Sequence, residues 1–138
     1  MRCYVDSSVI LRRVLLQTNV LKEWSQIRFV VSSRLVRLEC LRTIDRVRLH
    51  QVLTDDTVVQ RREEILALLE TIHLLPMTRH IYRRAEQPFI TPVGSLDALH
   101  LTTALLWRET RGDDLVFATH DGELGRAAKA HGFQVIGV

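Results

Sequence analysis

The chain has 138 residues, of which 46% are hydrophobic, and its formal net charge is +3. This length is typical of one domain with a substantial core, so we expect residues 1–138 to form a single domain. Neither an apolar run of membrane-spanning length nor a secretory leader pattern occurs in the sequence, and we therefore expect a cytoplasmic protein without a membrane partner.

The N-terminal half begins with a pattern typical of a strand followed by a helix. Residues 3–5 are apolar and β-prone, and Ser7 or Ser8 is a suitable cap for a helix that ends near Leu16. The following stretches predict, in order, a brief helix over 20–27, a strand over 29–31, a long helix capped by Ser32 or Ser33 and ending near 49, and a helix over 54–71.

The C-terminal half continues this alternation. It predicts a short strand ending at 74–76, a helix from 78 to about 87, a loop over 88–94, a helix from 95 to about 110, a turn over 112–114, a strand over 115–118, a helix over 121–131 and a strand over 133–136. Strands and helices that alternate at these spacings are typical of an α/β fold with a central parallel sheet and helices on both faces. Ligands of such folds bind beyond the C-terminal ends of the strands.

Two carboxylates follow predicted strands and are expected at that edge of the sheet. Asp6 follows the first strand directly, and Asp121 follows the strand over 115–118 after Thr119 and one more residue. Each also has a simple structural interpretation, because Asp6 suits a turn or a helix cap and Asp121 suits an N-cap.

Two further acids lie on predicted helices. Asp97 falls in the first turn of its helix, where the helix dipole also favours a negative charge. Glu39 lies between Leu35 and Val36 on a helical wheel, close to the apolar stripe, although a surface ion pair with Arg42 is also available to it. Several carboxylates at one edge repel one another unless a cation neutralises them. A set of oxygen ligands favours Mg²⁺ or Mn²⁺ over zinc.

Four segments together resemble the PIN-domain ribonucleases, and among them the VapC toxins of bacterial toxin–antitoxin pairs. The segments are YVDSS at the first strand, SSRLVRLECLR around Glu39, SLDALHLTTAL around Asp97 and LVFATHDGELGRAAKAHGFQVIGV at the end. Their order, spacing and flanking apolar pattern agree along the whole chain. The resemblance implies a PIN-like three-layer sandwich in which helices cover both faces of a parallel sheet.

By position, the resemblance assigns the family's acidic quartet, which binds Mg²⁺ or Mn²⁺, to Asp6, Glu39, Asp97 and Asp121. Thr119 matches the small hydroxyl residue before the last acid, and Ser7 matches another frequent hydroxyl position. Asp114 and Glu123 are alternatives for the fourth acid, and Asp121 is preferred because it follows the strand end. The quartet implies metal-assisted hydrolysis of RNA that leaves a 5′-phosphate and a 3′-hydroxyl.

The resemblance also implies partners. It predicts a homodimer that is neutralised by a VapB antitoxin, whose tail crosses the catalytic groove, and the apolar helix over 58–69 is a candidate contact. All but two of the 19 basic residues are arginines, whose side chains suit phosphate, although codon usage explains this bias equally well. The arginines nearest in sequence to Asp6 and Glu39 are Arg12, Arg13, Arg34, Arg37, Arg42, Arg46 and Arg48. Of these, Arg42 and Arg46 share the helix face of Glu39.

The sequence gives less support to two other functional classes. A phosphate-accepting receiver module requires an acid at the end of its middle strand, whereas the strand over 29–31 is followed by Ser32. A catalytically inactive PIN-like module that binds RNA or protein is the main alternative, and the complete quartet argues against it. The histidines lack the paired spacing of zinc sites, and we expect His100 to be a hydrogen-bonded structural residue. Cys3 and Cys40 are expected to be reduced core residues.

Overall fold

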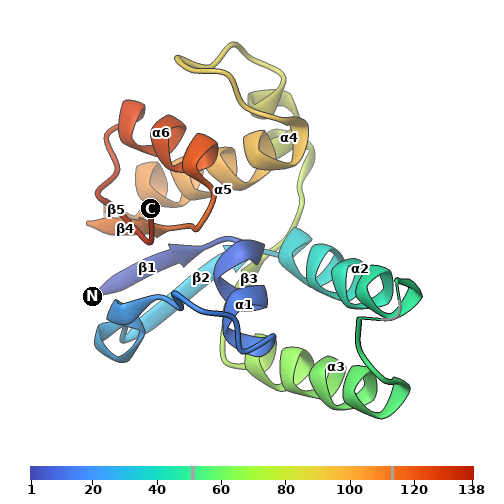
Figure 1. Cartoon of the computed structure of the whole chain (residues 1–138). Coiled ribbons are helices and arrows are strands. Elements are labelled where there is room, and N and C mark those ends of the chain that lie inside the picture. Colours follow the sequence, from blue (N-terminus) through green and yellow to red (C-terminus); the bar gives the residue numbers. More distant parts are fainter. Residues whose placement is uncertain (51, 113) are drawn as a thin grey trace.

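The computed structural model describes residues 1–50, 52–112 and 114–138. Its strands form one parallel sheet in the order β3-β2-β1-β4-β5 (Figure 1). The strands are β1 (Arg2–Val5), β2 (Phe29–Ser33), β3 (His73–Leu75), β4 (Leu115–Ala118) and β5 (Val135–Ile136). The predicted parallel α/β architecture is therefore confirmed.

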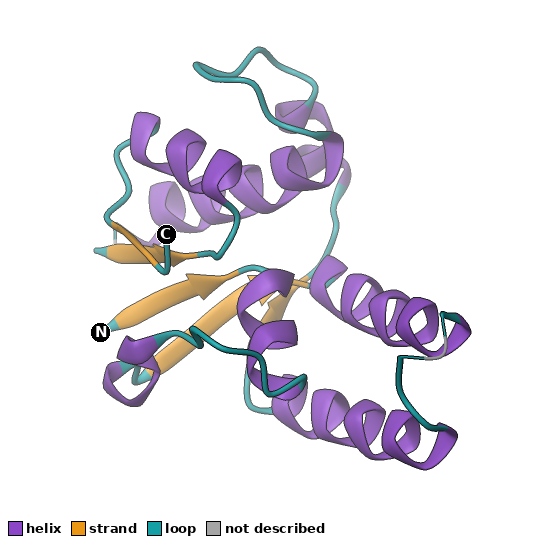
Figure 2. Ribbon diagram, viewed as in Figure 1, coloured by secondary structure: helices purple, strands orange, loops and turns teal. Residues whose placement is uncertain are grey.

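Helices cover both faces of the sheet, which forms the middle of three layers (Figure 2). One face carries α1 (Ser7–Val14), α2 (Leu35–Leu49) and α3 (Asp55–Glu70). The other carries α4 (Arg79–Ala85), α5 (Ser95–Arg111) and α6 (Gly122–Ala130). None of the helices in the described part of the chain combines the length and the apolar character that crossing a bilayer requires.

The central strand β1 supplies side chains to both layers of the core. Cys3 and Val5 pack with α1, α2 and α3, whereas Tyr4 packs with α5 and α6. Alternate side chains of a strand point to opposite faces, so a strand buried on both faces is apolar throughout. Cys3 and Cys40 are buried free thiols, as predicted.

Several helix starts differ from the sequence prediction. Ser32 and Ser33 lie within β2, because this strand extends to pair with β3, and the N-cap position of α2 falls on Arg34. Ser33 Oγ nevertheless accepts a hydrogen bond at 3.1 Å from the N–H of Leu35, the first residue of α2. Gly94 is the N-cap of α5, so that Ser95 is already its first helical residue. The predicted helix over 20–27 is a 3₁₀ helix, η1 (Lys22–Gln26).

Candidate functional site

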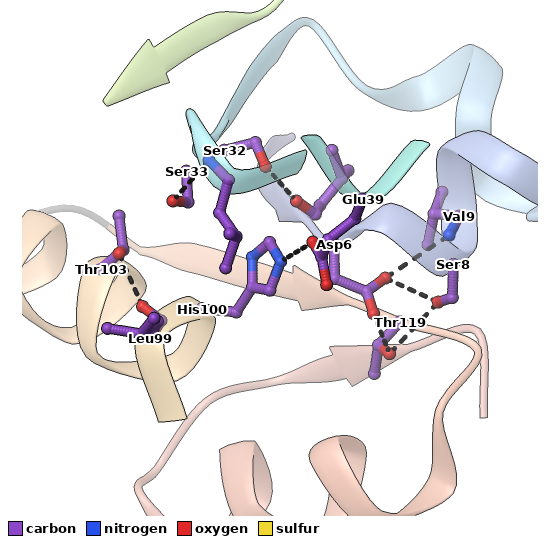
Figure 3. A network of polar contacts seen from close by, with 12 residues as sticks. Asp6, Ser8, Val9, Ser32, Ser33, Glu39, Leu99, His100, Thr103 and Thr119 are labelled. Atoms are coloured by element: carbon purple, nitrogen blue, oxygen red, sulfur yellow. Dashed lines mark hydrogen bonds and ion pairs between the residues drawn. The ribbon is translucent and has the colours of Figure 1, made fainter. Parts of the chain in front are cut away.

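Asp6 lies directly after β1 and is only 4% exposed. Ser8 Oγ donates a hydrogen bond to Asp6 Oδ1 at 2.6 Å, and Thr119 Oγ1 donates to Oδ2 at 3.0 Å (Figure 3). The backbone N–H of Val9 also donates to Oδ1 at 3.4 Å, which makes Asp6 the N-cap of α1. Burial raises the pKa of Asp6, and these hydrogen bonds oppose that shift.

The hydroxyl that holds Asp6 belongs to Ser8, whereas the resemblance pointed to Ser7. Ser8 Oγ also accepts a hydrogen bond from the backbone N–H of His120 at 2.9 Å, which ties α1 to the segment after β4. Ser7 instead lines a groove beside Glu39. Since Asp6 takes the cap position, α1 begins at Ser7, and the helical phase then turns only the second serine towards Asp6.

Thr119 is fully buried and links two of the predicted site acids. Besides donating to Asp6, its Oγ1 accepts a hydrogen bond from the backbone N–H of Asp121 at 2.9 Å. Asp121 Oδ1 in turn accepts from the backbone N–H groups of Glu123 and Leu124 at 2.8 and 2.9 Å. Asp121 is therefore the predicted N-cap of α6, and Thr119 makes the predicted hydrogen bond to an acid.

The C-terminal segment packs closely against Thr119. The Thr119 N–H donates to the carbonyl oxygen of Ile136 at 3.1 Å. Gly137 has a φ of 97°, and a Cβ at this position would lie 2.5 Å from the carbonyl oxygen of Thr119, so only glycine allows this approach. His120 Nδ1 lies 2.8 Å from the carbonyl oxygen of Gly137, so this ring is engaged away from the acids.

Glu39 contacts a histidine from another helix. Its Oε2 lies 2.6 Å from His100 Nε2, and the exposed fractions of the two side chains are 17% and 1%. The other ring nitrogen, Nδ1, lies 2.8 Å from the hydroxyl of Tyr4. Arg42 pairs with Asp45 at 2.9 Å, so the expected alternative of a surface pair between Arg42 and Glu39 is wrong. The contact with His100 explains how a carboxylate can lie beside an apolar stripe.

Asp97, in the first turn of α5, is sensitive to the charges of all three other acids. The pKa of Asp97 is raised to about 6, most strongly by burial and next by the negative charges of Asp121 and Asp6. The charge of Glu39 acts in the same direction. Acids from four separate segments therefore act electrostatically on one another at the C-terminal edge of the sheet.

These acids fit a hard divalent cation by donor type, because every candidate ligand atom is an oxygen. Within the described ranges, no three His, Cys, Asp or Glu side chains lie close enough together to hold an ion as they stand. Some of the carboxylate oxygens are already engaged, since Asp121 Oδ1 caps α6 and Glu39 Oε2 contacts His100. The negative charges around Asp97 nevertheless repel one another, and a bound cation would reduce this repulsion.

The family model described as PIN domain matches residues 3–130. The chain belongs to the PIN-domain family. The match runs from β1 to α6 and so includes all four acids, and membership of this family indicates a nuclease-type function that acts on nucleic acid. A comparison with curated proteins gives no significant match.

The topology of this PIN domain decides between two of the candidate fourth acids. Asp114 lies directly before β4, which runs parallel to β1, whereas Asp6 and Asp121 follow the far ends of these strands. Asp6 and Asp121 lie at the C-terminal edge of the sheet, which we call the acidic edge. At about 3.3 Å per residue, the four residues of β4 place Asp114 about 13 Å from this edge. Asp114 is therefore not one of the clustered acids, while Glu123 lies beside Asp121 in the first turn of α6.

A groove of about 510 Å³ opens beside Glu39 in the PIN domain. As their helical phase predicts, Arg42 and Arg46 lie in its wall with Glu39. Its other lining residues are Ser7, Leu35, Leu38, Thr43, Leu49, His50 and Leu96. This groove therefore combines apolar side chains with guanidinium groups next to one of the acids.

The remaining predicted arginines are engaged elsewhere or point to solvent. Arg12 donates to the carbonyl oxygen of Asn19 at 3.4 Å, and Arg13 lies over the ring of Trp24. Arg48 joins Arg42 in pairing with Asp45, and the exposed positions include Arg34 and Arg37.

Proposed function

We propose that this PIN domain is a Mg²⁺- or Mn²⁺-dependent endoribonuclease of the VapC type. Its cation ligands would come from Asp6, Glu39, Asp97 and Asp121, with Thr119 as their support. The observation that carries the proposal is the link between Asp6 and Asp121 through Thr119, at the edge of the sheet where the charges of the other acids also act on Asp97. Uncompensated buried charge is costly, so a site of this kind is best explained by a cation that neutralises it.

When bound at this edge, a divalent cation supplies a Lewis acid that lowers the pKa of a water molecule and neutralises charge on phosphate oxygens. The side chains of this edge would hold the cation in position. Ser8 and Thr119 hold the two oxygens of Asp6, so that this carboxylate has a defined orientation before a cation arrives. Asp97 lies where the dipole of α5 favours its negative form.

The groove beside Glu39 is the proposed path of the RNA. Guanidinium groups bind phosphate oxygens in pairs, and Arg42 and Arg46 place two such groups beside an acid of the site. Hydrolysis at the acidic edge would leave a 5′-phosphate and a 3′-hydroxyl, in accordance with the resemblance to VapC toxins.

We also propose that a VapB-type antitoxin covers this groove and that the toxin forms a homodimer. Leu38, Leu49 and Leu96 are 59%, 62% and 50% exposed, and the flanking arginines carry positive charge. A segment with apolar and acidic side chains complements this surface, and its presence would exclude RNA from Glu39. On α3, the exposed Val59 is a candidate contact for the second copy.

The proposal is tested by RNA cleavage in Mg²⁺ with the wild type, Asp6→Asn and Asp97→Asn. Each substitution should lower the cleavage rate by about 100-fold or more, and EDTA should abolish cleavage. Asp114→Asn is the matched control, because the same change at the opposite edge of the sheet should leave the rate unchanged. Equal rates for the wild type and Asp97→Asn, or cleavage that persists in EDTA, would contradict the proposal.

The target RNA is found by sequencing RNA ends after expression without an antitoxin. Fragments that begin with a 5′-phosphate and that are missing from cells expressing Asp97→Asn would define the cleavage site. If the wild type binds RNA but produces no new ends, the inactive PIN-like binding module becomes the better description.

A further inference from the structure

A buried row of hydrogen bonds runs behind the acidic edge. Tyr4 from β1, His100 from α5 and Glu39 from α2 form this row, and Tyr4 and His100 are 0% and 1% exposed. The Tyr4 hydroxyl lies 2.8 Å from His100 Nδ1. His100 Nε2 lies 2.6 Å from Glu39 Oε2 (Figure 3). Three elements from both sides of the sheet thus meet at one imidazole.

One arrangement of the hydrogens gives every group in this row a partner. The backbone N–H of Ser33 donates to the Tyr4 hydroxyl oxygen at 3.1 Å, so this oxygen is an acceptor and its own hydrogen is available for His100 Nδ1. When the Tyr4 hydroxyl donates in this way, Nδ1 carries a lone pair, and the ring hydrogen lies on Nε2, where it is donated to Glu39. The opposite tautomer would place a nitrogen lone pair against a carboxylate oxygen at 2.6 Å.

We propose that His100 is a positioning residue for Glu39. The hydrogen on its Nε2 holds Glu39 Oε2 and leaves Oε1 available to a cation. This inference rests on the proposed function, because it assigns to His100 a part in preparing the cation site. A carboxylate that is already oriented loses less freedom when it binds an ion, and hydrogen-bond partners of ligands typically change metal affinity by about 10- to 100-fold.

The tautomer is measured first, in metal-free protein, from the imidazole ¹⁵N shifts of histidine-labelled samples. His100 should give two well-separated shifts that identify a protonated Nε2 and a bare Nδ1, and His100→Leu should remove both signals. Tyr4→Phe should shift this pattern towards a mixture of tautomers, whereas the exposed His80 should give tautomer-averaged shifts in both proteins. A ring that is protonated on Nδ1 in the wild type would overturn the inference.

Titration with Mn²⁺ then tests the consequence. His100→Leu should weaken Mn²⁺ binding by about 10-fold or more. His100→Gln, whose amide can place an N–H near the position of Nε2, should bind more tightly than His100→Leu. Circular dichroism establishes that each variant is folded. If His100→Leu does not fold, Tyr4→Phe takes its place, and Mn²⁺ binding should again be weakened.

Two further outcomes separate this inference from the proposed function. The role of His100 would be overturned if His100→Leu bound Mn²⁺ with wild-type affinity, or if His100→Leu and His100→Gln lost equal affinity. If Asp97→Asn had lost Mn²⁺ binding in the same experiment, the cation site itself would remain in place. Wild-type affinity in Asp97→Asn would contradict the proposed function itself.

Discussion

Replacing Thr119 with valine tests how much the hydrogen bonds at the acidic edge contribute to the stability of the fold. Valine has nearly the shape of threonine, so Thr119→Val removes the hydroxyl without opening a cavity. The buried Oγ1 donates to Asp6 Oδ2 at 3.0 Å and accepts from the Asp121 N–H at 2.9 Å, and both interactions are lost.

The expected loss of stability follows from these two bonds. A hydrogen bond to a charged group contributes about 1.5–3 kcal/mol, and an N–H group left without a partner costs up to about 1–3 kcal/mol more where water cannot reach it. The Asp121 N–H is only partly buried, so we expect the free energy of unfolding to fall by about 2–3 kcal/mol. Urea unfolding at neutral pH in EDTA measures this change without a contribution from bound metal.

Thr102→Val provides a matched control within the same chain. Thr102 is also 0% exposed, but its hydroxyl has no hydrogen-bond partner in the part of the chain that the structure describes. This substitution removes a buried polar group that forms no bond, so it should leave stability unchanged or raise it by about 1 kcal/mol. If Thr119→Val is as stable as the wild type, or if Thr102→Val loses more stability than Thr119→Val, the described network does not hold the acidic edge together.

Three further predictions follow from the site and the core. The pKa of Asp97 is about 6 in the folded protein and ordinarily 3.8, so the folded state binds the Asp97 proton more tightly than the unfolded state. In EDTA, the contribution of this proton to the free energy of unfolding is complete below about pH 4 and is lost as the pH rises through 6. Asp97→Asn should therefore be more stable than the wild type by on the order of 1 kcal/mol at about pH 7.5 but not at about pH 4, and equal stability at both would contradict this assignment. Arg46→Ala should weaken RNA binding and lower the salt dependence of the RNA affinity by the equivalent of about one phosphate contact. Arg62 is exposed on α3, and Arg62→Ala should change neither the affinity nor its salt dependence. Burial raises the pKa of Cys3 to about 12 and also that of Cys40, so a thiol reagent at about pH 8 should label them only in denaturant, and rapid labelling of the folded protein would refute their burial.

The parts of the site that depend on sheet topology could be predicted from the sequence. Asp6 and Asp121 each follow a strand that is buried on both faces, and parallel strands bring their C-terminal ends to one edge. Helical phase was sufficient to place Arg42 and Arg46 on the side of Glu39. In each case one local pattern together with one general rule determines the position.

Contacts between distant elements could not be predicted in the same way. Glu39 and His100 lie on helices that cover opposite faces of the sheet, and no local spacing relates them. The only signal was that His100 follows Asp97 by three residues, which places both on neighbouring positions of α5. Ser8 was missed for a different reason, because its role depends on Asp6 being the cap of α1.

Anomalous diffraction from a crystal grown with Mn²⁺ shows whether acids from four segments bind one divalent cation. We expect an anomalous peak surrounded by oxygens of Asp6, Asp97 and Asp121, with Glu39 as a further ligand or one water molecule away. A well-ordered crystal with no peak at this edge, or with Mn²⁺ bound elsewhere while these carboxylates remain apart, would contradict this expectation.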